Sequence, residues 1–497
     1  MEKLFKLLRW IDENLIKLLV FGFIFIAPLY PKFPLKFIDY TYIAVRLEDL
    51  YIVGFFILFL IQLIRKKITL NKKFLFLILA FWAAAFISFL YGSFVQQTII
   101  YKHLGFLHFA RRVEYMVIFL MAASTIRSRK DFLFYFYSLI IALTITVLYG
   151  LGQKFIGFPA VQTMNPEFAK GYILYLTPEA RVSSTFAGHY DFAAYLNLFL
   201  PIVLGLFLLK GKLRYALLFL LSLFTLILTA SRSGFIAYIV SITAFLVYWK
   251  KFRLLIFILI LSFGLSAISK NLSSRFLQAV QIKQIFVNEK TGQVVVPQKI
   301  SVKNLPAGSL YLELNKKQKQ VTSQTEKLLQ EKILADIRDE ARKSGITLTA
   351  TEEAALAASA SAGLKPVNSV VSDISMATRI QVEWPRAIAA FLSNPILGKG
   401  PSTITEATDS DYLRWLGEFG LLGTSLFVFL LFSIGKFVWD KSKQVAESEK
   451  SIYHGFLFGF FALFIYAGYF DIFEASKVAY TFWTVAGTYV GYLSLKE

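Results

Sequence analysis

The feature that most constrains this chain is a series of apolar stretches that recurs along almost its whole length. Each stretch is long enough to cross a hydrocarbon layer of roughly 30 Å as a helix, and a backbone inside lipid must satisfy its own hydrogen bonds. The pattern therefore predicts an all-α fold, a polytopic membrane helix bundle rather than a string of soluble domains. We expect about twelve spans, at residues 15–30, 47–64, 74–95, 104–126, 132–153, 190–209, 213–230, 234–249, 254–269, 412–435, 452–470 and 476–494.

One long polar stretch interrupts the apolar pattern. Alternating apolar residues at 285–287 and 294–296 predict strands, and the patterns over 321–343 and 351–362 predict helices. We therefore expect a small α+β insertion. The predicted domains are a membrane domain over 1–269, an extracytoplasmic loop module over 270–411 with a re-entry segment at 376–411, and a second membrane domain over 412–497.

The charges of the connections predict how the chain is oriented. Lys and Arg crowd every second connection, as the positive-inside rule describes for cytoplasmic loops. These connections lie at 65–73, 127–130, 210–214, 250–253 and 436–450, whereas those near 96–101 and 471–477 carry little positive charge. We therefore predict a multi-pass protein of the cytoplasmic (inner) membrane with both termini cytoplasmic and the large loop outside. The segment 1–17 reads as an amphipathic interfacial helix.

The composition excludes some kinds of site and indicates which partners the chain binds. The chain has no cysteine, which excludes disulfides and thiolate metal sites. Its net charge of +21 arises mainly from residues flanking the apolar stretches, so we expect anionic lipids as partners and no nucleic acid. On the far side, the chemistry favours an anionic substrate. No group of residues with metal-ligand spacing occurs on the predicted extracytoplasmic side, so we predict no metal and no cofactor.

Four polar clusters at the predicted outer ends of spans are the candidate site. They lie at 178–196, 229–234, 376–401 and 408–423. Arg181 and Arg232 are permanent cations suited to phosphate, although interface or snorkelling arginines are the plainer alternatives. Asp409 and Asp411 stand where a span begins and could simply cap its helix. Glu418 lies four residues after an arginine, a spacing typical of a helical ion pair.

Taken together, the four clusters resemble the bacterial O-antigen ligase and O-antigen polymerase superfamily. Members carry an Arg before an Ala-Ala-x-Leu helix start, a Ser-Arg-(Ser/Gly)-Gly turn, an Arg and Trp before Pro-x-x-Gly-x-Gly, and Tyr-Leu before Glu-x-Gly-x-x-Gly. The matching residues here are Arg181, Asp191, Ser231 to Gly234, Arg379, Trp384, Pro395, Gly398, Gly400, Tyr412, Leu413, Glu418, Gly420 and Gly423. Asp409-Ser410 replaces the His-Asn pair of ligases, which favours the polymerase type.

The resemblance implies a metal-independent transferase whose donor is a polyprenyl-diphosphate-linked glycan. The acceptor is a glycan, a lipid or a protein hydroxyl. Arg181, Arg232, Arg379, Tyr412 and Glu418 then bind substrate. A hydroxyl nucleophile is helped by a base, and a leaving diphosphate by fixed cations. Asp409 is the first candidate base, with Asp411, His189 and Asp191 behind it.

A transporter or lipid-linked glycan flippase is the alternative from another class. Transporters usually place ionisable groups near mid-membrane and show repeated halves. Most span centres here lack charge and the chain shows no repeat. Arg111, Arg112 and Glu114, inside or near the outer half of the fourth span, are the exception. They predict either a buried ion pair or a gating or headgroup role.

Overall fold

The computed structural model describes residues 2–41, 43–163, 168–177, 179–268, 281–288, 294–295, 311–313, 330–331, 333–339, 341, 348–361, 364–371, 379–404 and 408–495. The chain divides into two compact units. The helical unit comprises Met1–Ser273, Asn394–Thr403 and Ser410–Glu497. The insertion unit comprises Ser274–Ser393 and Ile404–Asp409. The predicted strand over 294–296 is described only at Val294–Val295, and most of the predicted helix over 321–343 lies outside the described residues.

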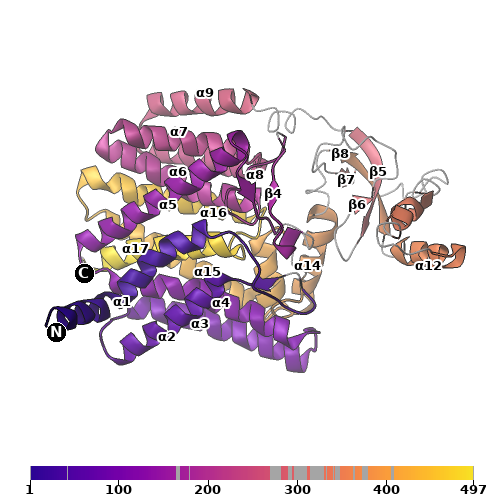
Figure 1. Ribbon diagram of the computed structural model, residues 1–497, viewed down its shortest axis with the longest axis horizontal. Helices are drawn as coiled ribbons and strands as arrows, with labels where there is room; N and C mark the ends of the chain where they lie inside the picture. Colours follow the sequence, from indigo (N-terminus) through magenta and orange to yellow (C-terminus); the bar gives the residue numbers. More distant parts are fainter. Residues whose placement is uncertain are drawn as a thin grey trace. The chain divides into compact units, whose positions relative to one another are not determined.

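Helices make up most of the helical unit (Figure 1). Their bounds are α1 (Glu2–Leu29), α2 (Leu47–Ile64), α3 (Lys72–Leu90), η1 (Tyr91–Val95), α4 (Lys102–Thr125), α5 (Arg129–Phe155), η2 (Phe168–Lys170), α6 (His189–Lys210), α7 (Leu213–Leu228), α8 (Arg232–Tyr248), α9 (Phe252–Ile268), α15 (Asp411–Ser442), η5 (Glu447–Glu449), α16 (Lys450–Ala467) and α17 (Ser476–Ser494). Every predicted span coincides with a helix in this list. The predicted interfacial helix and first span form one continuous helix, α1.

Length and apolar character mark six described segments as able to cross a membrane: α2, α3 with η1, α5, α6, α15, and η5 with α16. The apolar helices α7, α8 and α9 are shorter. α4 carries Arg111, Arg112 and Glu114 within its length. The chain is thus a multi-pass membrane protein, while the number of twelve spans stays a prediction.

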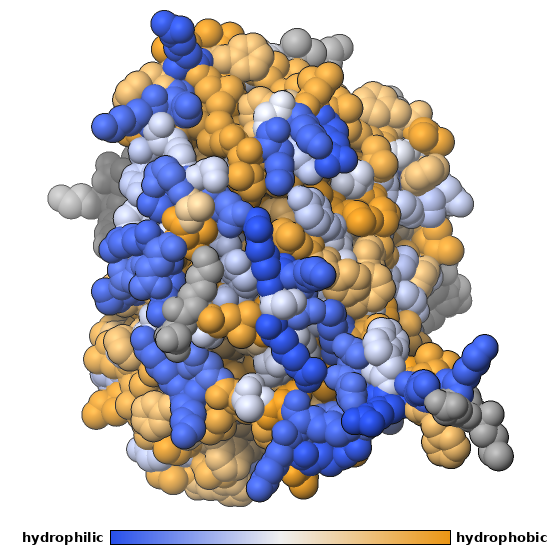
Figure 2. Space-filling view, turned by 90° about the vertical axis from the view of Figure 1, so that its left-hand side faces the viewer, coloured by the Kyte–Doolittle hydropathy of each residue, from blue (hydrophilic) through white to orange (hydrophobic). Residues whose placement is uncertain are grey.

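The connections between helices gather at two opposite ends of the unit. Both chain termini lie at one end (Figure 1), where hydrophilic side chains cross the surface between hydrophobic margins (Figure 2). Ion pairs tie the connections together there, including Arg65 with Asp12, Lys17 with Asp131, and Arg129 with Glu449. These are the basic connections that the sequence predicts to be cytoplasmic.

The core of the unit forms around α17. Every residue from Ser476 to Leu493 is buried, which is typical of a helix enclosed on all sides. It packs against α1, α4, α5, α6 and α15. Glycines allow the closest approaches, because a Cβ at Gly487 would lie 2.5 Å from the Phe119 carbonyl oxygen and one at Gly491 2.6 Å from that of Ala123. Small residues four apart give membrane helices this fit.

Short strands cover the other end of the helical unit. They form two antiparallel pairs, β1 (Lys36–Phe37) with β2 (Ala44–Val45) and β3 (Pro159–Ala160) with β4 (Leu174–Tyr175). The insertion unit contains a four-stranded antiparallel sheet in the order β6-β5-β8-β7. Its elements are β5 (Gln281–Asn288), β6 (Val294–Val295), β7 (Tyr311–Glu313), α12 (Ala350–Ser361), β8 (Leu364–Val371), η4 (Arg379–Glu383) and α14 (Trp384–Ser393). The predicted strand at 285–287 and helix at 351–362 are therefore present as β5 and α12.

Candidate functional site

The first cluster forms a loop that ends at the start of α6. Arg181 donates from Nη1 to Nε2 of His189 across 2.6 Å. Because a guanidinium can only donate, Nε2 must accept, and the neutral ring carries its proton on Nδ1. Asp191 lies in the first turn of α6, where the helix dipole favours a carboxylate. His189 is buried, whereas Arg181 and Asp191 are half-buried.

The second cluster is the turn between α7 and α8. Ser231 is the N-cap residue of α8 and accepts a hydrogen bond from the amide of Gly234. Arg232 is therefore the first residue of the helix and is half-buried. Asn197, on α6, donates to the Gly234 carbonyl at 3.0 Å, which fixes this turn beside the start of α6.

A segment absent from the predicted site joins these clusters to the start of α15. We call it the connector; it comprises residues 466–474, from the end of α16 to the loop before α17. The Tyr466 hydroxyl hydrogen-bonds both the Ser231 hydroxyl, at 3.0 Å, and the Tyr190 carbonyl, at 3.3 Å. Phe470 packs on the Tyr190 ring with centroids 4.6 Å apart. Asp471 then accepts from the Ser410 amide at 3.1 Å.

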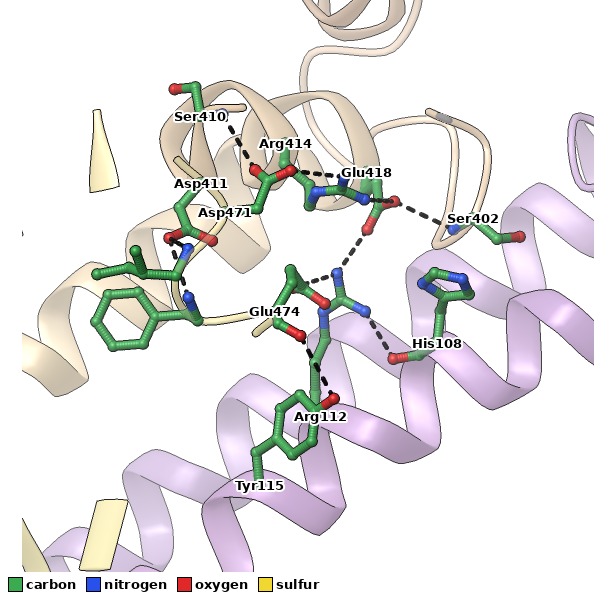
Figure 3. Close-up of polar contacts among 12 residues, drawn as sticks. His108, Arg112, Tyr115, Ser402, Ser410, Asp411, Arg414, Glu418, Asp471 and Glu474 are labelled. Carbon is green, nitrogen blue, oxygen red and sulfur yellow. Dashed lines mark hydrogen bonds and ion pairs between the residues drawn. The ribbon is translucent and has the colours of Figure 1, made fainter. Parts of the chain in front are cut away.

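Buried charges surround the connector, as Figure 3 shows. Arg112 of α4 pairs with both Glu418 and Glu474 at 2.7 Å. Arg414 pairs with Asp471 at 2.8 Å and with Glu418 at 3.5 Å. Both guanidinium side chains are at most 5% exposed, so each charge is costly unless it is compensated. The network therefore fixes α4, α15 and the connector in one arrangement.

Glu418 has a full set of protein partners. Besides the two arginines, its Oε1 accepts from the amide of Ser402 at 3.2 Å. The expected helical ion pair with Arg414 is present, but it is the longest of these contacts. The geometry favours a role for Glu418 in positioning, and its predicted contact with substrate remains untested.

The aspartates at the start of α15 do not cap it. Ser410 is the N-cap residue and accepts from the Leu413 amide. Asp411 is buried and accepts from the amides of Ile472 and Phe473, at 2.8 and 3.1 Å, so it shapes the connector instead. The Tyr412 hydroxyl donates to the Phe464 carbonyl of α16. Capping, the plainer interpretation of Asp409 and Asp411, is therefore wrong for this helix.

Two glycine motifs that are separate in the sequence form one structure. α15 breaks at Gly420, which has φ 60° and ψ −163°. The turn at 395–400 pairs with the broken helix through four backbone hydrogen bonds: Lys399 N to Gly417 O, Gly400 N to Glu418 O, Leu421 N to Pro395 O, and Leu422 N to Ile396 O. A Cβ at Gly398 would lie 2.5 Å from the Glu418 carbonyl carbon, so only glycine fits there.

Ser88 completes this pairing. Its hydroxyl lies 2.7 Å from the carbonyl oxygens of both Leu397 and Glu418. The interruption of helix α15 at Gly420 therefore leaves few backbone groups without hydrogen bonds, because the turn and Ser88 replace the hydrogen bonds that the helix loses. Non-helical backbone at membrane depth is tolerated where protein groups satisfy it in this way.

The insertion unit contributes one predicted pair. Arg379 lies 2.7 Å from the carboxylate of Asp409. The Arg379 side chain is 7% exposed and that of Asp409 is 23% exposed. Asp409 has φ +49°, a left-handed conformation that Asp and Asn adopt more readily than most residues. Trp384, a residue of the predicted third cluster, begins α14, which follows a single π-helical turn.

Two buried lysines anchor the base of the Arg181 loop. Lys477 donates to three backbone carbonyls, those of Pro28, Tyr30 and Thr185. Lys32 lies 3.3 Å from Glu48 and also hydrogen-bonds Ser476. Burial, reinforced by the charge of Arg46, lowers the pKa of Lys32. These contacts connect the ends of α1 and α17 to the loop that carries Arg181.

The four clusters predicted from the sequence do not include the connector. The only signal was a pair of carboxylates, Asp471 and Glu474, in a short and otherwise apolar connection. Arg112, an exception within a predicted span, proves to be a buried ion-pair partner as expected. Arg111 and Glu114 are part of α4, and Glu114 accepts from the Tyr480 hydroxyl. Among the described residues, no three His, Asp or Glu side chains form a group able to hold a metal ion.

Comparison with known proteins gives one family. Residues 217–428 match the family model described as O-Antigen ligase. Comparison with curated proteins gave no match. The matched range includes the Ser231 turn, Arg379, the paired glycine motifs and the start of α15. Residues 217–428 are therefore similar to the O-antigen ligase family, and this match and the apolar helices together support a membrane protein of polysaccharide biosynthesis.

Proposed function

We propose that this chain transfers a polyprenyl-diphosphate-linked glycan onto an acceptor hydroxyl during the assembly of cell-surface polysaccharide. The observation that carries the proposal is the connector, which holds the Arg181 loop, the Ser231 turn and the start of α15 together at one end of the bundle. This end is opposite the basic connections. It is therefore the end at which we place the extracytoplasmic substrate.

In the proposed reaction, the acceptor oxygen attacks the anomeric carbon of the donor glycan. A new bond forms between that carbon and the acceptor oxygen, the bond to the diphosphate breaks, and the lipid diphosphate leaves. The hydroxyl proton passes to a base. Negative charge develops on the diphosphate, and fixed donors aimed at it lower the barrier. The step needs no oxidant, reductant or metal ion.

Arg181 and Arg232 are the proposed diphosphate ligands. Each guanidinium offers paired donors that match phosphate oxygens. Arg232 is held at the first position of α8, so we propose that it binds the diphosphate throughout the reaction. The neighbouring amides at the helix N-terminus also favour an anion. Arg181 lies on a longer loop, and we propose that it stabilises the negative charge that develops on the diphosphate as the glycosidic bond to it breaks.

Asp409 remains the proposed base. His189 suits the role less, because its Nε2 already accepts a hydrogen bond from Arg181. Asp411 suits it less as well, since its Oδ2 accepts two amide hydrogen bonds in the connector. We propose that Arg379 orients the Asp409 carboxylate and that Asp191 and Tyr412 help to shape the acceptor side. Because Asp409-Ser410 stands in the place of the ligase His-Asn pair, we favour a growing glycan chain as acceptor over a lipid core or a protein.

The test is transfer by the purified protein in nanodiscs supplied with lipid-linked glycan. We expect longer glycans on the lipid carrier, and we expect Arg232→Lys and Arg181→Lys to lower kcat by roughly 10²–10³-fold, because an ammonium cannot make the paired contact. Wild-type rates in both lysine variants would remove the diphosphate assignment. Formation of lipid-linked product on the opposite leaflet without any change in glycan length would point to a flippase.

Metal independence is tested in the same assay. We expect transfer to persist in excess EDTA, since two fixed cations take the place of an ion. Activity that is lost with EDTA and restored by magnesium or manganese would contradict this part of the proposal.

A further inference from the structure

A pair of stacked tyrosines, at the end of the helical unit that carries the short strands, has no part in the reaction proposed above. Tyr40 lies near the tip of the hairpin formed by β1 and β2, and Tyr101 directly precedes α4. Their ring centroids are 4.2 Å apart and the ring planes are inclined by only 11°. Tyr40 is nevertheless 71% exposed and Tyr101 40% exposed. One face of the Tyr40 ring is therefore covered by Tyr101 while much of the side chain still meets the surroundings.

The backbone holds this pair in place. Tyr40 has φ +65°, an uncommon conformation for an aromatic residue, and the hairpin hydrogen bond from Ile38 N to Ile43 O closes the turn around it. Nε2 of His103 lies 3.5 Å from the Asp39 carbonyl oxygen. The hairpin tip and the start of α4 thus meet at an exposed aromatic surface with polar groups at its edge.

Two contacts link the segments that carry the tyrosines to neighbouring loops of the helical unit. On one side, Pro34, which shortly precedes β1, lies against Gly171, in the loop that leads to Arg181. On the other, the Thr98 hydroxyl donates to the Lys399 carbonyl at 2.5 Å, and Lys399 belongs to the turn that pairs with α15. The two segments that carry the tyrosines therefore adjoin the Arg181 loop and the glycine turn.

We propose that Tyr40 and Tyr101 form a glycan-binding subsite, which rests on the proposed function for its choice of ligand. The ring faces of pyranose sugars carry C–H groups that pack on aromatic rings, while their hydroxyls need polar partners. The exposed face of Tyr40 supplies the first, and the exposed Asp39 and His103 supply the second. A tyrosine at a membrane interface would need only its apolar body, not a stacked partner and a polar edge.

The experiment uses the full-length protein in nanodiscs and separates the two glycan sources. One arm titrates lipid-linked glycan as donor, and the other titrates a lipid-free oligosaccharide released from the cell-surface polysaccharide. Binding of the oligosaccharide is also followed without transfer, by saturation-transfer NMR. We expect Tyr40→Ala to raise KM in one arm about three- to tenfold with kcat and thermal stability unchanged, which corresponds to one lost aromatic contact. Tyr40→Phe retains the ring and should bind as the wild type does.

Tyr40→Leu and Ile100→Ala are the controls. The Tyr40→Leu variant keeps apolar area without a ring, so we expect it to fail as Tyr40→Ala does. Ile100 is 83% exposed and precedes Tyr101, so its removal tests the apolar surface alone and should leave KM unchanged. Normal KM in Tyr40→Leu, or equal losses in Tyr40→Ala and Ile100→Ala, would assign the tyrosines to the membrane interface. Oligosaccharide binding that depends on Tyr40 in a protein without transfer activity would overturn the proposed function but not the subsite.

Discussion

At the scale of single residues, Asp409 is the sharpest test of the chemistry. Ser410 caps α15, so the helix has no need of the Asp409 carboxylate, and asparagine also tolerates the left-handed conformation at this position. We expect Asp409→Asn to stay folded and to lower turnover by roughly two to four powers of ten in the nanodisc assay. Near-normal turnover would reject Asp409 as base and direct attention to Asp191.

Arg112 tests the buried charges. Arg112→Met leaves Glu418 and Glu474 without a shared cation, and breaking a buried pair from one side costs about 3–5 kcal/mol. The measurement is the free energy of unfolding of the purified protein in bicelles. Lys436→Met is the matched control, because that lysine is 63% exposed and pairs with Asp440 on the surface, where a loss of about 0–1 kcal/mol is expected. Equal losses in the two variants would show that the network contributes little.

The residues of the site were predictable to different degrees. Arg181, Arg232 and Asp409 stand out in the sequence because they are charged residues near predicted span ends. Asp471 and Glu474 do not, since a carboxylate in a short loop is ordinary until its partners are known. Those partners, Arg414 and Arg112, are 57 or more residues away in the chain, and no local pattern encodes such a pairing. The role of Asp411 could not be predicted for the same reason.

At the scale of elements, the contact between α6 and α16 depends on glycine. A Cβ at Gly459 would collide with the Leu198 carbonyl, and one at Gly455 would lie 2.6 Å from that of Pro201. We expect Gly459→Ala to force the helices apart and to destabilise the protein by about 1–3 kcal/mol. Gly264→Ala in α9 is the matched control, because nothing lies within 4 Å of its added Cβ, and it should be neutral or slightly stabilising. The readout is the same unfolding measurement.

Helix positions were the most predictable part of the fold. Length and hydropathy located α2 at 47–64 and α17 at 476–494 without error, because lipid and core impose the same demand for apolar residues. The break in α15 was not predictable as a break. Gly420 adopts the positive φ that interrupts the helix. The hydrogen bonds that replace those of the helix come from the turn at 395–400, and no sequence periodicity predicts that this turn pairs with α15.

At the scale of the whole molecule, orientation is the claim with the widest consequences. The chain has no cysteine, so single cysteines report without a background. We expect Thr351→Cys, exposed in the insertion unit, to react with an impermeant maleimide in intact spheroplasts, and Lys212→Cys, exposed between α6 and α7, to react only after lysis. The opposite pattern would invert the topology and place the proposed site in the cytoplasm.

The burial of α17 has a consequence for how the protein is made. The helices that enclose it, α1, α4, α5, α6 and α15, precede it in the chain and leave the ribosome earlier. Until α17 inserts among them, their inward faces meet lipid, the translocon or one another. We therefore expect assembly to finish late, with the unfinished bundle open to insertases and to quality-control proteases that survey the membrane. A ribosome stalled before α17 would leave an intermediate whose lifetime in the membrane depends on those factors.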